Sequence, residues 1–208
     1  MAVVESICRP INLPGERTVQ VDIVFCGMWY CMVELSPSKN PELCAQVQLE
    51  CKDGHKLVSL AGQIRAACVE QHPVCHPITG YQGPDMLLFY SRNPSPDADA
   101  MNAVVNEWKA TLLRSACGTA TCAAMALAYA QGELSIQHRW LQKSIVGSML
   151  AGRLTRESKL AGTDKTSVIA EYEGRAWISQ KCEIVIDPTD PFQSGFMVSD
   201  LWGECRGT

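Results

Sequence analysis

An alanine-rich run from Cys117 to Gly132 limits the fold of this chain more than any other stretch. It opens with Cys-Gly-Thr, continues almost entirely with small or apolar residues, and stops at a glycine, which readily ends a helix in the left-handed conformation. The run therefore predicts a helix over residues 117–131. Because the small side chains cover every face rather than one stripe, we expect the helix to be buried and closely surrounded by strands.

Cys117 stands in the first turn of this predicted helix, directly before Gly118 and Thr119. The first turn has backbone N–H groups without intrahelical partners, and it carries the positive end of the helix dipole. Both features favour an anion, either a cysteine thiolate or a bound carboxylate. The alternative is that Cys117 is a core thiol like most of the others. The Gly-Thr that follows it at a helix N-terminus favours the functional interpretation.

Strand-like and helical runs before this helix indicate a mixed α+β domain. A hairpin is predicted over residues 18–35, where apolar and polar residues alternate before a turn at Gly27. One helix is expected to open at Asn40-Pro41, and another follows the three-and-four spacing of apolar residues over 57–68. A continuous apolar run over 86–90 predicts a buried strand.

Short strands are expected to supply the rest of the sheet. The proline-rich and acidic residues 91–99 predict an exposed loop. Further strands are predicted over residues 103–108, 134–140, 144–150, 167–173, 175–179 and 182–186.

Composition excludes several classes of function. The 208 residues are 47% hydrophobic and 19% charged, so they can bury a core, and a net charge of −4 without a basic cluster argues against binding nucleic acid or an anionic membrane. No apolar run approaches the ~20 residues of a membrane span, and the first residues lack the layout of a signal peptide. We therefore expect a cytoplasmic protein whose 11 cysteines are reduced and mostly buried.

A metal site is the sharpest alternative role for the cysteines. Cys68, His72, Cys75 and His76 place four zinc-capable side chains in one short segment. Four ligands from so short a segment rarely close a tetrahedron, and no distant second pair accompanies them. We therefore predict no metal site.

Several stretches, in collinear order, resemble the proline racemase family of proline racemases, hydroxyproline epimerases and hydroxyproline dehydratases. The segment from Leu113 to Ala123 resembles the family motif Asp-Arg-Ser-Pro-Cys-Gly-Thr-Gly-Thr-Ser-Ala. The segment from Val21 to Tyr30 resembles the family hairpin Val-Asp-Ile-Ala-Phe-Gly-Gly-Asn-Phe-Phe. Two later family motifs resemble residues 144–153 and 187–196. The resemblance covers nearly the whole chain.

The resemblance implies a fold with two lobes, each a rolled sheet that encloses a helix, as in the diaminopimelate-epimerase-like fold. This chain resembles the second, C-terminal lobe alone, because the opposing Cys-Gly-His motif of the first lobe does not occur in it. Residues 1–186 would form the lobe, and residues 187–208 would return to the first lobe. Without that lobe, apolar surface around Phe192, Phe196 and Trp202 would be exposed and favour self-association.

The resemblance also implies an activity that needs no pyridoxal phosphate and no other cofactor. Family enzymes racemise proline or epimerise hydroxyproline with two cysteines that face each other across the substrate. Cys117 would be one of the pair, and the N–H groups of Gly118 and Thr119 would hold the substrate carboxylate. Alone, the chain would lack the opposing cysteine, so we expect it to be inactive unless a separate N-terminal half joins it. The sequence does not distinguish proline from hydroxyproline.

Departures from the family motif leave a second function open. Leu113 stands where the family has an acidic residue that helps to set the protonation of the thiol. Ala116 replaces a proline and Ala120 replaces a glycine. The alternative is therefore a non-catalytic homologue that binds a ligand or a partner. Retention of Cys117 fits racemases and epimerases better than the dehydratases, which often replace this cysteine.

Overall fold

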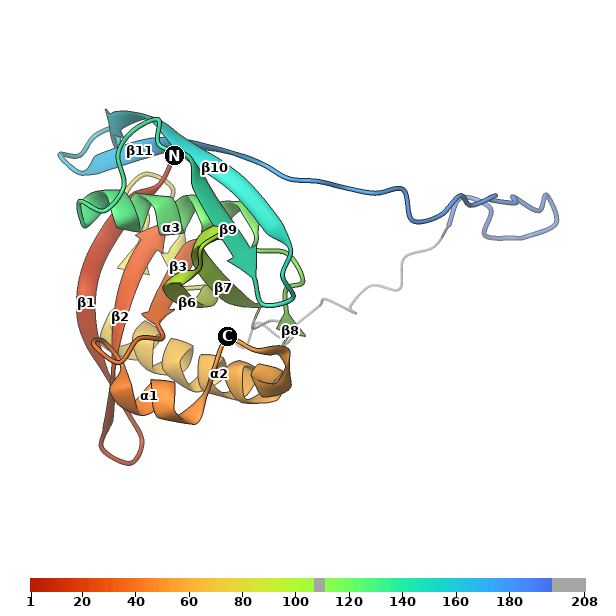
Figure 1. Ribbon diagram of the computed structural model, residues 1–208. Helices are drawn as coiled ribbons and strands as arrows, with labels where there is room; N and C mark the ends of the chain where they lie inside the picture. The colour runs from red at the N-terminus through yellow and green to blue at the C-terminus, as the bar shows by residue number, and fades with distance from the viewer. Residues whose placement is uncertain (107–110, 196–208) are drawn as a thin grey trace. The chain divides into compact units, whose positions relative to one another are not determined.

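A computed structural model describes residues 1–106 and 111–195 of the chain (Figure 1). The chain divides into a unit over Met1–Arg175 and a second unit over Ala176–Thr208. The first unit ends before residues 176–186, which the predicted lobe over 1–186 includes. The division into a lobe over 1–186 and a returning segment over 187–208 stays a prediction.

Within the described residues, the first unit is built on a nine-stranded mixed sheet. The β3–β6 and β7–β9 pairs are parallel, and the remaining neighbours are antiparallel. In order across the sheet, the strands are β1 (Val3–Leu13), β2 (Arg17–Phe25), β3 (Trp29–Glu34), β6 (Met86–Ser95), β7 (Ala98–Asn106), β9 (Trp140–Ser144), β10 (Met149–Lys159) and β11 (Thr166–Glu173), with β8 (Thr111–Leu112) paired to β7.

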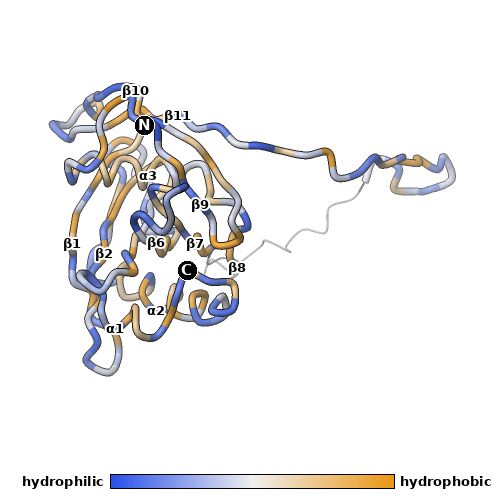
Figure 2. Tube along the Cα trace, viewed as in Figure 1, coloured by the Kyte–Doolittle hydropathy of each residue, from blue (hydrophilic) through white to orange (hydrophobic). Residues whose placement is uncertain are grey.

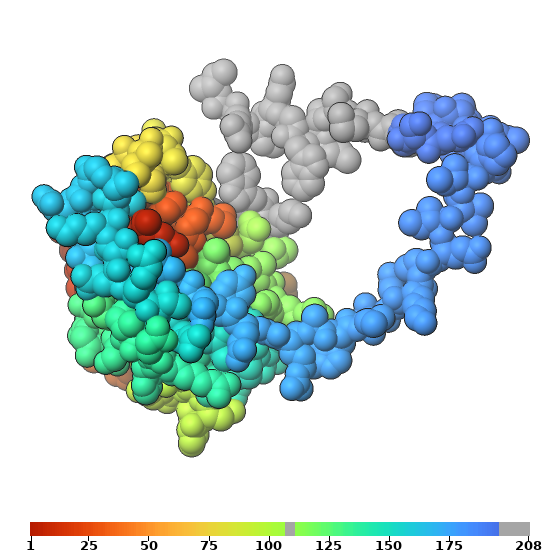
Figure 3. All heavy atoms as spheres, turned by 90° about the horizontal axis from the view of Figure 1, so that it is seen from above, coloured from red at the N-terminus to blue at the C-terminus, as the bar shows by residue number. Residues whose placement is uncertain are grey.

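The two ends of this sheet meet. The backbone N–H of Ala2 donates to the carbonyl of Val168 at 2.8 Å, and the N–H of Val168 donates back to the carbonyl of Ala2 at 2.9 Å. Figure 3 shows the N-terminal residues, in red, beside residues of β10 and β11, in cyan. The sheet is therefore rolled. Helix α3 (Gly118–Ala130) packs against β1 at one end of the sheet and against β10 and β11 at the other.

The other helices cover the outer face of the sheet (Figure 1). Helix α1 (Pro41–Gln46) has proline at its first position, as the sequence predicts, and the short η1 (Cys51–Asp53) leads into α2 (Gly54–Gln71). Figure 2 shows apolar and polar residues alternating along α2, whose buried side chains are Leu57, Leu60, Ala61, Ile64 and Cys68. A two-stranded hairpin of β4 (Val74–Cys75) and β5 (Gln82–Gly83) follows. None of the helices in the described ranges is long and apolar enough to cross a membrane.

The central strands are buried on both faces, so their side chains divide between two cores. In β3, Tyr30 and Met32 join the inner core around α3, whereas Cys31 and Val33 join the outer core beneath α2. This arrangement explains the continuous apolar run predicted over residues 86–90, because both faces of β6 need apolar side chains. The rolled sheet around an alanine-rich helix confirms the predicted α+β class.

Three of the loop and strand predictions in the first unit are wrong. Residues 91–99 are not a loop, because β6 continues to Ser95 and β7 begins at Ala98. A register shift between Arg92 and Ser95 accommodates Pro94, and Pro96 lies in the turn between the two strands. The predicted strand over 134–140 is absent, since β9 begins only at Trp140. The predicted strand over 144–150 is wrong as well, because residues 145–148 form the turn between β9 and β10.

The described part of the second unit, residues 176–195, contains no helix or strand. The strands predicted over 175–179 and 182–186 are therefore wrong. Strand backbones need a neighbouring strand to accept their hydrogen bonds, and β-branched composition alone does not supply one. The apolar side chains of this segment are instead exposed, namely Trp177, Ile178, Ile184, Val185, Ile186 and Phe192. Phe196 and Trp202, which the self-association prediction also uses, lie outside the described residues.

Asp22 of β2 is a carboxylate on the inner side of the rolled sheet. It is 6% exposed, and it accepts hydrogen bonds from the backbone N–H of Cys8 at 2.8 Å and from the hydroxyl of Tyr90 at 3.2 Å. Burial raises the pKa of Asp22 above its ordinary value of 3.8, although these two bonds and the Lys39 ammonium act in the opposite direction. Glu34 adds to the rise.

We expect Asp22→Asn to remove a pH-dependent loss of stability. A raised folded-state pKa means that the folded protein binds this proton more tightly than the unfolded chain. The stabilisation is complete below the ordinary value of 3.8 and is lost as the pH rises through the raised pKa. Urea unfolding between pH 4 and pH 8 should therefore show the wild type losing free energy of unfolding relative to Asp22→Asn. Asp164→Asn, at an exposed position, should follow the wild type. Parallel profiles for wild type and Asp22→Asn would contradict the expectation.

Candidate active site

Cys117 lies at the N-terminus of α3 and is its N-cap residue, so the helix begins one residue later than predicted. Its φ of 62° is uncommon for a residue with a side chain and is held by local hydrogen bonds. The carbonyl of Cys117 accepts from the N–H and the hydroxyl of Thr121, each at 2.8 Å, and its N–H donates to Ser115 Oγ at 3.1 Å. The thiol is half-buried. Such a constrained backbone is typical of functional positions.

Two hydroxyl groups flank the Cys117 sulfur. Tyr30 Oη lies 3.6 Å from Sγ, Thr119 Oγ1 lies 3.5 Å from Sγ, and the two hydroxyl oxygens are 2.6 Å apart. Tyr30 comes from β3 and is fully buried, so the hairpin and the helix meet at this sulfur. Burial, and then the nearby Cys117, raise the pKa of Tyr30 well above its ordinary value of 10. The phenol therefore stays protonated and can donate a hydrogen bond at any ordinary pH.

The glycines of this region allow close approach to the first turn of α3. A Cβ at Gly118 would overlap the ring of Tyr172 from β11, a side chain that is 53% exposed. Gly27, in the turn between β2 and β3, has a φ of 74°, and a Cβ at this position would point toward the methyl group of Thr119. No side chain caps this end of α3, so the N–H groups of Gly118 and Thr119 have no intrahelical acceptor.

The segment before Cys117 is held by two side chains that sequence reasoning did not single out. Asn102 of β7, only 1% exposed, donates from Nδ2 to the carbonyl of Ala116 at 2.8 Å. Ser148 donates from Oγ to the carbonyl of Arg114 at 3.1 Å. Both contacts join positions that are far apart in the chain, and the only sequence signal was the family motif that contains Ser148.

The three residues that depart from the family motif, Leu113, Ala116 and Ala120, make apolar packing contacts in this structure. Leu113 packs against the inner core, and its N–H donates to the carbonyl of Val104 at 2.9 Å. Ala116 and Ala120 are fully buried. Nothing acidic stands at position 113, and the polar contacts recorded for the Cys117 sulfur in the described ranges are the hydroxyls of Tyr30 and Thr119.

Cys122 is a packing residue, as predicted. It is 6% exposed and hydrogen-bonds to Cys26, which is 7% exposed and directly follows β2. This bond, together with burial, raises the pKa of the Cys122 thiol well above its ordinary value. Cys122 therefore stays a neutral thiol beneath the site.

The four metal-capable side chains between positions 68 and 76 do not converge. Cys68 is buried and hydrogen-bonds to Cys31. His72 Nε2 lies 3.0 Å from the carbonyl of Pro10, and His76 Nδ1 accepts two backbone N–H groups at 3.3 Å. Across residues 1–106 and 111–195, no group of three or more His, Cys, Asp or Glu side chains is placed to hold a metal ion.

A surface cavity of about 460 Å³ lies beside β10 and β11. It contains none of the residues of the predicted site. Two arginines and two glutamates contribute to its walls, and two of these, Arg153 and Glu171, pair with each other. Its lining residues are Gln137, Arg139, Ala151, Gly152, Arg153, Glu171, Tyr172 and Glu173.

The chain is similar in sequence to known proteins over most of its length. The family model described as "Proline racemase" matches residues 4–197. A proline racemase from Clostridioides difficile is 30% identical over 189 residues, which are 90% of this chain and 53% of that protein. A 4-hydroxyproline 2-epimerase from Streptosporangium roseum is 29% identical over 193 residues, covering 91% of this chain and 54% of that protein. The chain therefore spans about half the length of the relatives it matches.

Solved structures share the fold. A hydroxyproline epimerase from Agrobacterium vitis, solved with trans-4-hydroxy-L-proline bound, superposes with a TM-score of 0.75 at 22% identity, covering 98% of this chain and 55% of that one. A probable proline racemase from Agrobacterium radiobacter K84, solved with carbonate bound, superposes with a TM-score of 0.76 at 23% identity, covering 97% of this chain and 56% of that one.

Proposed function

The chain belongs to the proline racemase family, and we propose on this premise that Cys117 is one of the two acid/base groups of an amino-acid racemase or epimerase. One observation carries the proposal. The Cys117 sulfur lies at the uncapped N-terminus of α3, within 3.6 Å of two hydroxyl groups. A thiolate at this position is stabilised by the helix dipole and can accept a hydrogen bond from each hydroxyl.

In the proposed reaction, the Cys117 thiolate removes the α-hydrogen of the substrate as a proton and becomes a thiol. The electron pair of the broken C–H bond moves into the adjoining carboxylate, whose negative charge increases. The N–H groups of Gly118 and Thr119 bind this carboxylate and stabilise the added charge. A thiol on the opposite face then donates its proton to the α-carbon and inverts it. The chemistry is proposed to need no pyridoxal phosphate and no metal, because both proton transfers use side chains.

We propose that the opposing thiol belongs to another lobe. Residues 1–186 would form the C-terminal lobe of a diaminopimelate-epimerase-like enzyme, and residues 187–208 would return to the other lobe. The coverage of 53% and 54% of two relatives supports the view that this chain corresponds to about half of a longer enzyme. The apolar side chains after Arg175 are exposed. Exposed apolar surface seeks a partner, so association with a separate N-terminal half or with a second copy is proposed as well.

The proposed substrate is proline or hydroxyproline, the substrates that the names of the relatives give. The cytoplasm is the proposed location, because 11 cysteines suit a reducing compartment. A non-catalytic homologue remains the outcome if Cys117 proves inert.

A pulse of substoichiometric iodoacetamide on the folded chain, with each cysteine read by peptide mass, is expected to modify Cys117 faster than the buried Cys122. Pyrrole-2-carboxylate, a planar mimic of the deprotonated substrate, should slow Cys117 because it occupies the N–H groups of Gly118 and Thr119. The neutral pyrrole-2-carboxamide is the matched control ligand and should protect less. Exposed Cys51 and Cys75 report general reactivity and should not respond to either compound.

If Cys117 is as inert as Cys122 in a demonstrably folded chain, the proposed function fails. Equal protection by the carboxylate and the carboxamide would leave Cys117 reactive but would remove Gly118 and Thr119 as a carboxylate site.

A further inference from the structure

The Cys117 sulfur shares a triangle of hydrogen-bonding atoms with Tyr30 and Thr119. The side chains come from β3 and from the first turn of α3, and the three edges of the triangle measure 3.6, 3.5 and 2.6 Å. We infer that Tyr30 is a positioning residue for Cys117, and that its hydroxyl, together with that of Thr119, orients the sulfur and stabilises its thiolate. The inference rests on the proposed function and adds a residue to it.

The two hydroxyls can serve both protonation states of the sulfur. When Cys117 is a thiolate, Tyr30 and Thr119 can each rotate a proton toward Sγ, and hydrogen bonds to a charged acceptor are about twice as strong as neutral ones. When Cys117 is a thiol, the hydroxyls can bond to each other across 2.6 Å and leave the sulfur free to give up its proton. Neither step changes the charge of Tyr30, which stays protonated because burial raises its pKa.

The packing around Tyr30 fixes its hydroxyl in place. The residue is fully buried in the inner core, and β3 is held in register by β2 on one side and by β6 on the other. Thr119 is held by its place in the first turn of α3, and its hydroxyl lies 2.6 Å from that of Tyr30. Because the Tyr30 side chain is packed on all sides, its hydroxyl stays in a fixed position relative to the Cys117 sulfur.

The hydroxyls of Tyr30 and Thr119 are important because the residue at position 113 is leucine rather than an acid. The resemblance predicts an acidic residue at position 113 that would help to set the protonation of the thiol, and an isobutyl side chain cannot do so. The described contacts to Cys117 Sγ are the two hydroxyls. They are therefore the side-chain groups that can act on the thiol together with the N-terminus of α3.

Other titratable groups face the same region and are kept constant in the test. Cys26 directly after β2 and Cys122 of α3 form a buried pair that interacts electrostatically with the Tyr30 and Cys117 cluster. Tyr172 of β11 lies against Gly118.

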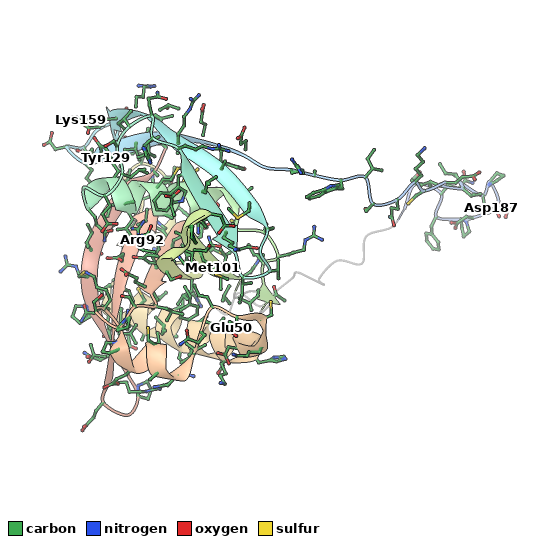
Figure 4. The ribbon with its side chains drawn as sticks, viewed as in Figure 1. Glu50, Arg92, Met101, Tyr129, Lys159 and Asp187 are labelled. Carbon is green, nitrogen blue, oxygen red and sulfur yellow. The ribbon has the colours of Figure 1, made fainter. Side chains whose placement is uncertain are left out.

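The test is the pH profile of Cys117 alkylation by iodoacetamide in the whole chain, read by peptide mass. Tyr30→Phe removes only the hydroxyl, and the midpoint of the profile should rise by about one pH unit, which is about a tenfold slower reaction at pH 7. Tyr129→Phe is the matched control, because Tyr129 lies in the last turn of α3, where its hydroxyl bonds to Glu157 (Figure 4). Its midpoint should stay at the wild-type value.

A second pair of variants covers the case in which Tyr30→Phe does not fold. Thr119→Val keeps the shape and the backbone N–H of Thr119 but removes Oγ1, so its midpoint should also rise. Thr119→Ser keeps the oxygen and should restore the wild-type midpoint. A structural role alone would not separate these two variants by their pH profiles.

The outcomes separate the inference from the proposed function. If wild-type Cys117 is fast and is protected by pyrrole-2-carboxylate, while folded Tyr30→Phe keeps the same midpoint, the inference is overturned and the function stands. Identical midpoints for Thr119→Val and Thr119→Ser overturn it as well. If wild-type Cys117 is inert, the proposed function fails and the inference fails with it.

Discussion

L-Proline and trans-4-hydroxy-L-proline are expected to keep their optical rotation when either is incubated with the 208-residue chain alone. Inversion needs a base on one face of the α-carbon and an acid on the other. In the described ranges, Cys26 and Cys122 share the inner core with Cys117, and they are buried and hydrogen-bonded to each other. They cannot face Cys117 across a substrate. Polarimetry over several hours should therefore show no detectable change.

The proline racemase of Clostridioides difficile, assayed in the same buffer with proline, is the positive control. A steady loss of rotation that Cys117→Ser abolishes would contradict the expectation, because the chain would then supply both acid/base groups. Slow replacement of the α-hydrogen by deuterium without inversion would agree with a single base. A loss of rotation that survives Cys117→Ser would point to a contaminating racemase.

The position of Cys117 could be predicted from sequence because the signal is local. A run of small residues that starts with Cys-Gly-Thr and stops at Gly132 defines a helix and its N-terminus without reference to the rest of the chain. The structure places the helix over Gly118–Ala130, within one residue of the prediction at each end. Its burial also followed from sequence, because a helix without a polar face has to be enclosed.

Tyr30 could not be predicted as a partner of Cys117. The two residues are 87 positions apart, and the strand places neighbouring aromatic side chains on opposite faces. Trp29 joins the outer core and Tyr30 joins the inner one. Because both faces of β3 are buried, hydrophobicity alone does not say which face meets the helix. Only the assembled sheet shows that Tyr30 is the one that reaches the sulfur.

The errors at residues 91–99 have a related cause. Pro94 and Pro96 suggest a loop, since proline cannot donate a hydrogen bond to a sheet. Pro96 lies in the turn between β6 and β7. The structure tolerates Pro94 because Arg92 pairs with Ala100 and Ser95 pairs with Ala98, with an irregular register between the two pairs. A bulge of this kind depends on a neighbouring strand, which sequence periodicity does not reveal.

Ala123→Leu is expected to lower the free energy of unfolding by about 3 kcal/mol. Nine of the 13 residues of α3 are buried, and Ala123 is completely inaccessible to solvent. Leucine adds three carbon atoms where the helix packs against strands from both ends of the sheet. The hydrogen bonds between Ala2 and Val168 join those ends, so the sheet cannot open without breaking them. The larger side chain therefore fits only if neighbouring side chains adopt strained rotamers or the helix moves.

Ala130→Leu is the matched control, because it makes the same chemical change in the same helix at an exposed position. Its free energy of unfolding should stay within about 0.5 kcal/mol of the wild type, so that helix propensity and added hydrophobicity are both accounted for. Urea denaturation followed by circular dichroism at 25 °C, with equal m-values, measures both variants. If Ala123→Leu is as stable as Ala130→Leu, the space around α3 is not filled. The close packing that holds the N-terminus of the helix, and with it the Cys117 sulfur beside Tyr30, would then lose its physical basis.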